Sequence, residues 1–289
     1  MARRRKRPSR SRVSGRSHRP RRSGARASRL KRLALINMLA VAGAIAGVFV
    51  LIAVLTPKPF DEQSLCVESD TLPPHTAVIV DKTDEYSQVQ ADRIAAAIRR
   101  EQNTLALGER FSLYELDARG RFDPRGAFSL CNPGRGDQAN PLFRNPKRME
   151  ERYTEMFEGP LDGVLDDLVE PKEAPSSPIL EAIARLAQTE AYSPAAPSRR
   201  LLLISDMLQN SDAFTAYGGG GVEMPPDSPA PSSVADAITD RFGDNLRGVR
   251  LEVLLIPRDT HVDLQRGALK TFWDEVARDL GMDITWRDL

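Results

Sequence analysis

Cysteine and histidine are both scarce in this sequence of 289 residues, which contains two cysteines and three histidines. The histidines, His18, His75 and His261, form no ligand spacing with Cys66 and Cys131. This argues against a zinc site, which needs about four Cys or His ligands at close spacing. The sequence also lacks a Gly-x-Ser-x-Gly motif, so it gives no support for a serine hydrolase that carries its nucleophile on that turn.

Negative charge is missing from residues 1–32, which contain fifteen Lys or Arg and no Asp or Glu. The remaining chain carries 26 basic residues against 40 acidic ones, so the net charge of +1 hides a basic tail and an acidic body. Because the tail is rich in Arg, Ser, Pro and Gly and has little apolar surface to bury, we expect residues 1–32 to be disordered. Anionic lipid headgroups are its expected partner, and binding to nucleic acid or another protein is the weaker alternative.

Charge of either sign is absent from residues 33–55, where Asn37 is the only clearly polar side chain. At about 1.5 Å per residue, a helix of this length spans roughly 34 Å, which exceeds the bilayer core of about 30 Å. We therefore expect a transmembrane helix in the lipid bilayer. A buried core helix and a cleavable signal peptide are the alternatives, but the run is longer than a signal core and no small-x-small cleavage pattern precedes residues 56–59.

The distribution of basic residues predicts an orientation for this helix. Fifteen of them precede the helix, and Lys58 alone follows it closely. Since Lys and Arg stay on the cytoplasmic side, we expect a single-pass protein of the cell inner membrane with a cytoplasmic amino terminus and a periplasmic or other extracytoplasmic domain. An oxidising compartment would allow Cys66 and Cys131 to form a disulfide. Two separate buried thiols are the alternative.

Residues 56–74 contain four prolines and predict a stalk that leads into a domain at residues 75–289. The domain alternates strand patterns with helix patterns; we expect strands at 75–80, 110–116, 127–131, 200–205, 249–256 and 283–286, and helices at 87–104, 141–168 with a break near Gly159 and Pro160, 178–190, 234–242 and 264–280. This alternation predicts an α/β fold of the Rossmann-like kind, a mainly parallel sheet with helices on both faces. Residues 216–233 are rich in Gly, Pro and Ser and predict a flexible loop.

Two of the expected strands end in acidic residues. The sequence AVIVDKTDEYS places Asp81 at the end of the first strand with Thr83 just beyond, and RLLLIS at 200–205 is followed by Asp206. If the two strands are neighbours in a parallel sheet, their acidic ends meet at one edge. Carboxylate and hydroxyl oxygens are the ligands of hard cations such as Mg²⁺. In the alternative interpretation, the aspartates cap the helices that follow and hold no metal.

This order of features resembles the von Willebrand factor type A domain with its metal-ion-dependent adhesion site. In that family the first loop has the pattern Asp-x-Ser-x-Ser, the second loop gives a Thr and the third an Asp, and together they hold one divalent cation. Ser176 or Ser177, just before a helix that begins with Pro178, stands where the second-loop Thr would be. The resemblance implies that Mg²⁺ or a similar divalent cation is held by Asp81, Thr83, Ser177 and Asp206.

The sequence departs from the family pattern at the second Ser of the first loop. Glu85 stands there, and Ser87 lies two residues further along. The resemblance implies binding of another protein, with the cation bridging to a carboxylate of that partner. One alternative is a membrane-anchored, metal-dependent phosphatase or hydrolase, but a haloacid-dehalogenase-like enzyme would need a second Asp where Thr83 stands. The other is a scaffold component of an envelope complex with a degenerate metal site.

Overall fold

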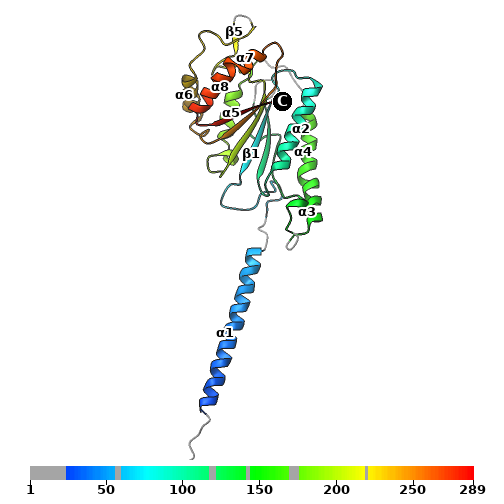
Figure 1. Cartoon of the computed structure of the whole chain (residues 1–289), viewed down its shortest axis with the longest axis vertical. Helices are drawn as coiled ribbons and strands as arrows, with labels where there is room; N and C mark the ends of the chain where they lie inside the picture. The colour runs from blue at the N-terminus through cyan, green and yellow to red at the C-terminus, as the bar shows by residue number, and fades with distance from the viewer. Residues whose placement is uncertain (1–23, 56–59, 117–121, 141–143, 169–175, 219–220) are drawn as a thin grey trace, which may run out of the picture. The chain divides into compact units, whose positions relative to one another are not determined.

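The structure is a computed structural model, and it describes residues 24–55, 60–116, 122–140, 144–168, 176–218 and 221–289 (Figure 1). The chain divides into two compact units, Met1–Pro57 and Lys58–Leu289, which we describe separately. The described part of the first unit is one helix, and the second unit contains the α/β domain.

Helix α1, Gly24–Leu55, is drawn in blue in Figure 1. Its segment Ser28–Ile52 has a mean hydropathy of 2.5 and is long and apolar enough to cross a membrane. The helix begins before residue 33, so residues 24–32 are helical and not disordered as expected. Ala, Leu, Lys and Arg are good helix formers, and no proline interrupts this stretch. The remaining tail, residues 1–23, lies outside the described residues.

Six strands form one sheet in the order β3-β2-β1-β4-β7-β8 (Figure 1). Their bounds are β1 His75–Asp81, β2 Arg110–Leu116, β3 Phe128–Cys131, β4 Arg199–Ser205, β7 Arg250–Leu255 and β8 Asp283–Asp288. Neighbouring strands are parallel, except that β2 and β3 are antiparallel. Counted along the chain, this is the doubly wound order 3-2-1-4-5-6. The predicted mainly parallel sheet is confirmed, with an antiparallel strand at one edge.

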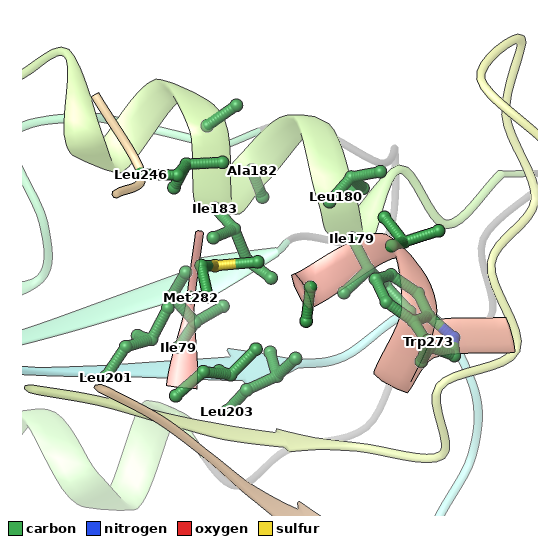
Figure 2. Close-up of a cluster of buried hydrophobic side chains, with 14 of the residues drawn as sticks. Ile79, Ile179, Leu180, Ala182, Ile183, Leu201, Leu203, Leu246, Trp273 and Met282 are labelled. Carbon is green, nitrogen blue, oxygen red and sulfur yellow. The ribbon is translucent and has the colours of Figure 1, made fainter. Parts of the chain in front are cut away.

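Helices cover both faces of the sheet, as predicted, and each face has its own apolar core. The helices of one face are α5 Ile179–Ala187, α6 Pro231–Phe242 and α8 Ala268–Asp279, and those of the other include α2 Gln88–Thr104 and α4 Gly159–Leu168. Ile79 and Leu203 belong to the first core, which Figure 2 shows with Trp273 of α8 at one end. Val78 belongs to the second core, because successive side chains of a strand point to opposite faces.

Two of the predicted helices, 141–168 and 264–280, are interrupted. The first consists of α3 (Pro146–Tyr153), a π-helical turn η2 (Thr154–Glu158) and α4. Pro160 has no N–H, and its ring crowds the carbonyl four residues back. The chain accommodates Pro160 with the wider π-helical turn just before it, where the sequence predicted a break. The second is divided at Gly267 into α7 (Val262–Arg266) and α8.

The Gly/Pro-rich segment contains more regular structure than predicted. A hairpin of β5 (Tyr217–Gly218) and β6 (Gly221–Val222) lies within it, and α6 already begins at Pro231. Val222 and Met224 pack against the first core, which explains why this part of the loop has a defined course. Residues 219–220 lie outside the described residues.

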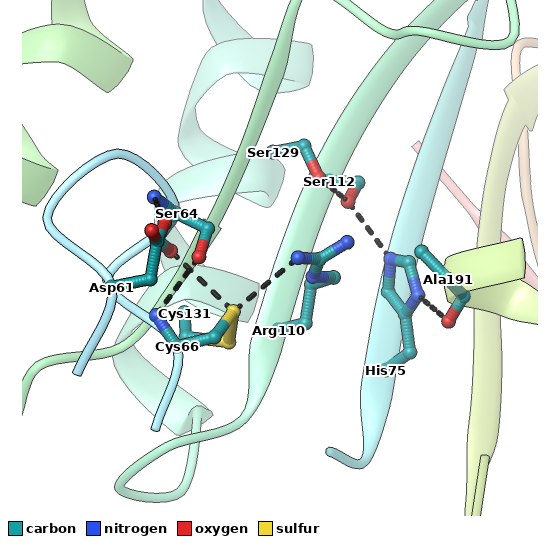
Figure 3. The surroundings of a disulfide bond; sticks show 9 residues. All are labelled: Asp61, Ser64, Cys66, His75, Arg110, Ser112, Ser129, Cys131 and Ala191. Carbon is teal, nitrogen blue, oxygen red and sulfur yellow. Dashed lines mark hydrogen bonds between the residues drawn. A yellow bond between two sulfur atoms is a disulfide. The ribbon is translucent and has the colours of Figure 1, made fainter. Parts of the chain in front are cut away.

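The segment before β1 is fastened to the domain (Figure 3). Cys66 and Cys131 form a disulfide with their Cα atoms 4.8 Å apart, so the predicted pairing is present. The Ser64 carbonyl accepts a hydrogen bond from the Cys131 amide over 2.8 Å, and the Leu65 side chain is buried in the second core. Residues 64–66 of the predicted stalk are therefore fixed to the domain, while residues 56–59 lie outside the described residues.

Candidate metal-binding site at the carboxyl edge of the sheet

The two acidic strand ends meet at one edge of the sheet. Strands β1 and β4 are parallel neighbours, with Val80 paired to Ile204, so Asp81 and Ser205 are the next residues on the two strands. Asp206 follows Ser205 directly. The residues Asp81 and Asp206 are 5% and 3% exposed. This edge between β1 and β4 is the switch point of the doubly wound sheet, where such folds bind ligands.

The Asp81 carboxylate accepts hydrogen bonds at both oxygens. Oδ1 accepts from the Thr83 backbone N–H over 3.1 Å and from Thr83 Oγ1 over 2.6 Å. Oδ2 accepts from Ser205 Oγ over 2.8 Å and lies 3.3 Å from Ser177 Oγ. Thr83 Oγ1 and Ser177 Oγ are themselves 3.0 Å apart. Carboxylate and hydroxyl oxygens from three separate parts of the chain, the end of β1, the loop before α5 and the end of β4, thus form one hydrogen-bonded group.

A backbone pairing positions Ser177 in this group. The Ser177 amide donates to the Asn210 carbonyl over 3.0 Å, and the Asn210 amide donates back to the Ser177 carbonyl over 2.9 Å. Gln209, the residue before Asn210, adds a second link, because its Oε1 accepts a hydrogen bond from the Leu180 amide at the start of α5 over 3.0 Å. The loop before α5 is therefore tied to the loop after β4. Of the two serines predicted as alternatives, Ser177 is the one beside Asp81, and Ser176 lines a neighbouring cavity of about 250 Å³.

The Asp206 carboxylate is held by groups from two loops. Its Oδ1 accepts from the Leu208 amide over 3.0 Å, and its Oδ2 accepts from Arg258 Nε over 2.7 Å. Met207, between Asp206 and Leu208 in the sequence, has a positive φ of 64°. A non-glycine residue adopts this conformation only where its surroundings hold it. The Trp273 indole N–H supplies part of that hold by donating to the Met207 carbonyl over 3.1 Å.

Arg258 and Ser205 are the residues of this site that the sequence reasoning missed. Arg258 follows β7, the strand next to β4, and it also donates from Nη1 to the carbonyl of Glu85 in the first loop. A signal was present, because VLLIPR places a cation two residues after another buried strand. Ser205 ends the RLLLIS strand pattern, and nothing else in the sequence indicates its role.

The departures of the first loop from the family pattern have structural counterparts. The Glu85 side chain is exposed, and its backbone carbonyl is the group that joins the site. Ser87 caps α2, since its hydroxyl accepts from the Gln90 amide and the Gln90 side chain accepts from the Ser87 amide. Ser87 therefore serves as a helix cap and does not replace the missing second serine of the pattern.

The carboxylates of the site disfavour each other's ionisation. Burial, and then the charge of Asp206, raise the pKa of Asp81 to about 6, although hydrogen bonds from Thr83 and Ser205 oppose the shift. The half-buried Asp84 also has its pKa raised to about 6, by burial and by Asp206, with the Arg258 guanidinium acting in the opposite direction. Both shifts indicate an excess of negative charge at this edge of the sheet.

The donor set fits a hard cation. A divalent ion would offset the mutual repulsion of Asp81 and Asp206, and hydroxyls with water would complete an oxygen shell. Among the residues that the structure describes, no three or more Asp, Glu, His or Cys side chains form a group that could hold a metal ion. The cation would therefore depend on two carboxylates assisted by the hydroxyls of Thr83 and Ser177.

His75 belongs to a different part of the molecule. It starts β1, at the end of the strand opposite to Asp81, and Nδ1 lies 2.8 Å from the Ala191 carbonyl oxygen while Nε2 lies 2.8 Å from Ser112 Oγ (Figure 3). Burial lowers the pKa of His75 to about 4. The ring is therefore a neutral core side chain with both nitrogens bonded, and it does not join the carboxylate site.

No family model matches this chain, and no curated protein matches it in sequence. Its fold is similar to those of solved structures. A mutant of the PilB minor pilin from Streptococcus sanguinis aligns with 10% identity and a TM-score of 0.41 over 77% of this chain, which spans 58% of that pilin. BatB, a conserved hypothetical protein from Bacteroides thetaiotaomicron, aligns with 13% identity and a TM-score of 0.36 over 74% of this chain and 90% of its own.

A third similar structure is proximal thread matrix protein 1 from the mussel byssus, with 12% identity and a TM-score of 0.38 over 77% of this chain and 43% of that one. Its description gives a zinc-occupied MIDAS motif, the metal-ion-dependent adhesion site, in that protein. In the present chain, the strand order and the loops that meet at the β1–β4 edge make the fold von Willebrand factor A-like.

Proposed function

We propose that the domain binds another protein through a divalent cation held at the β1–β4 edge, and that α1 anchors it in a membrane. The observation that carries this proposal is the burial of Asp81 and Asp206 at the ends of two neighbouring strands at the switch point of the sheet, where burial and the charge of Asp206 raise the pKa of Asp81. Buried carboxylates of this kind either take up protons or pair with a cation.

Mg²⁺ is the cation whose chemistry the donors suit, because it prefers carboxylate oxygens and keeps part of its shell open to other ligands. Asp81, Thr83, Ser177 and Asp206 would hold it. The ion would supply an open coordination position for a carboxylate of the partner. The chain's own contribution is to hold these oxygens in place through the Ser177–Asn210 pairing and the bonds that fix Met207.

The proposed location is the cell inner membrane with the domain in the periplasm or another extracytoplasmic space. The basic residues before the apolar helix favour a cytoplasmic amino terminus. The Cys66–Cys131 disulfide is consistent with an oxidising compartment for the domain. Anionic lipids on the cytoplasmic side are the proposed contact of the basic tail.

Calorimetry and partner capture test the proposal on the full chain in detergent micelles. Wild type should bind Mg²⁺ or Mn²⁺. It should also capture a partner from solubilised membranes, and a chelator should release that partner. Asp81→Ala and Asp206→Ala should lose both, whereas Asp227→Ala, at an exposed position in the Gly/Pro-rich segment, should keep both. Absence of metal heat in the wild type would reject the metal site. Metal-dependent phosphatase turnover that disappears in Asp81→Ala would reassign the domain as an enzyme.

A scaffold function without metal is the second candidate, and the position of Arg258 favours it. Its guanidinium already supplies one positive charge to Asp206. In that case partner capture would survive the chelator and the Asp206→Ala substitution.

A further inference from the structure

Arg258 connects all the loops of the site except the one that carries Ser177. Nε donates to Asp206 Oδ2 over 2.7 Å, and Nη1 donates to the Glu85 carbonyl. The Arg258 backbone is fixed as well, since its amide donates to Gln265 Oε1 over 2.8 Å. The buried Gln265 side chain in turn donates to the carbonyls of Asp206 and Ile256 over 2.9 and 3.0 Å. Through Gln265, the Arg258 backbone is thus tied to the Asp206 backbone, which keeps the guanidinium beside the Asp206 carboxylate.

The Arg258–Asp206 ion pair is far less exposed than the Arg266–Asp288 pair at the same separation. The Arg258 side chain is 20% exposed and that of Asp206 is 2% exposed. The Arg266–Asp288 pair has the same 2.7 Å separation, but its side chains are 55% and 57% exposed. Exposed pairs are screened by water and contribute little, whereas a pair with a buried carboxylate is screened far less. Arg258 therefore acts on Asp206 with much greater effect than Arg266 acts on Asp288.

A guanidinium keeps its charge at every pH at which a protein is folded. It is therefore a permanent cation beside the carboxylate that a divalent ion would also use. Two cations that share one carboxylate repel each other, and each weakens the other's hold on it. Three carboxylates, of Asp81, Asp84 and Asp206, act on one another at this edge. Arg258 bonds directly to one of them, Asp206.

We propose that Arg258 is the resident counter-ion of the site, which ties the first loop to Asp206 when no metal is bound and sets the affinity of the site for a divalent cation. This inference rests on the proposed metal-dependent function. A bound cation would share the negative charge of Asp206, so it would weaken the ion pair between Asp206 and the Arg258 guanidinium. The Glu85 carbonyl then loses its partner, and the first loop, which begins at Asp81, becomes free to adjust to a bound protein.

The test compares Arg258→Gln with the matched control Arg266→Gln in the full chain in detergent micelles. Calorimetric titration with MnCl₂ gives the dissociation constants, and thermal unfolding without metal gives the stability at pH 8. Arg258→Gln should bind Mn²⁺ at least tenfold more tightly than wild type and unfold at a lower temperature without metal. Arg266→Gln should change neither value, because its pair is exposed.

The outcomes separate this inference from the proposed function. Equal or weaker Mn²⁺ binding by Arg258→Gln, with binding by wild type, overturns the counter-ion and leaves the metal site standing. Binding by Arg258→Gln alone supports the counter-ion and overturns metal-dependent function in the native chain. Absence of binding in both overturns both.

A measurement on the wild type keeps the inference testable if Arg258→Gln does not fold. Phenylglyoxal modifies accessible arginines, and peptide mass spectrometry gives the extent at each position. Saturating MnCl₂ should raise modification of Arg258 severalfold, because the guanidinium is released from Asp206. Modification of Arg266 should stay the same. Unchanged modification of Arg258 at saturating metal would overturn the inference.

Discussion

Ser205 donates a hydrogen bond from its Oγ to Oδ2 of Asp81 over 2.8 Å, across the neighbouring strands β4 and β1. Ser205 Oγ also accepts a hydrogen bond from the Met207 amide over 2.8 Å. One buried hydroxyl therefore connects the first acidic strand end to the strained residue that follows the second. It stabilises the ionised form of Asp81, which burial alone would disfavour.

Ser205→Ala should destabilise the domain by about 1–3 kcal/mol, because it leaves the Met207 amide and one side of the Asp81 carboxylate without their buried partner. It should also raise the pKa of Asp81 further. Urea unfolding of the full chain in micelles, followed by tryptophan fluorescence, measures the loss. Ser232→Ala, at an exposed position in the first turn of α6, is the control and should keep the wild-type midpoint. An unchanged midpoint in Ser205→Ala would show that the hydroxyl is dispensable.

The sequence was sufficient to predict that the two acidic strand ends meet. The runs before Asp81 and Asp206 are almost wholly apolar, which is typical of strands buried on both faces in a parallel sheet. Alternation with helices then limits the possible strand orders to a few. The role of Arg258 needed one more fact, that β7 lies directly beside β4, and local patterns along the chain carry no information on that adjacency.

Reduction of the Cys66–Cys131 disulfide should lower the free energy of unfolding substantially. The bridge closes a loop of 65 residues, for which the chain-entropy model gives about 4 kcal/mol as an upper-end figure. Urea midpoints with and without a dithiol reductant measure the difference, and the Cys66→Ala, Cys131→Ala double variant should not respond to the reductant. Thiol labelling of unfolded, unreduced protein should find no free cysteine, and two labelled cysteines would contradict the pairing.

The segment before β1 is tied to the domain by the disulfide. Four prolines within residues 56–74 predict a stalk. Within this segment Leu65 is buried in the second core, and it reaches that position with a positive φ of 58°. In the sequence, Leu65 is followed by Cys66 and Val67, and so short an apolar stretch between polar residues is a weak signal. The adjacent Cys66 is bonded to Cys131 at the end of β3, which holds this backbone against the β3 edge.

An enzyme reporter that is active only after export should be active when it is fused after Leu289. The reason is that fifteen basic residues precede the apolar span and keep the amino terminus in the cytoplasm. The same reporter fused after Arg32, before the uncharged run, should be inactive. Activity of a cytoplasm-only reporter at Leu289 would show the opposite orientation. Replacing the Lys and Arg residues of 3–32 by Gln should reduce the export of the domain.

Without metal, the stability of the domain should fall as the pH rises from about 4 to about 7. The pKa values of Asp81 and Asp84 are raised from 3.8 to about 6 in the folded state. Between these values the folded protein holds more protons than the unfolded chain, and stability falls with pH wherever the folded state holds more protons. Above the folded-state pKa both groups are ionised in both states, so their contribution to the slope ends.

Mg²⁺ should oppose this fall, because it binds the ionised carboxylates. The rise in melting temperature on adding MgCl₂ should therefore be small at pH 5 and larger at pH 7.5. Thermal unfolding of the full chain in micelles, with chelator or with MgCl₂ at each pH, measures both effects. Asp81→Asn removes one of the two titrating groups and a buried negative charge. Its melting temperature in chelator should depend less on pH, and MgCl₂ should no longer raise it, whereas the exposed control Asp227→Asn should behave as wild type. A metal effect that is equal at pH 5 and 7.5, or that persists in Asp81→Asn, would mean that the cation acts elsewhere on the chain.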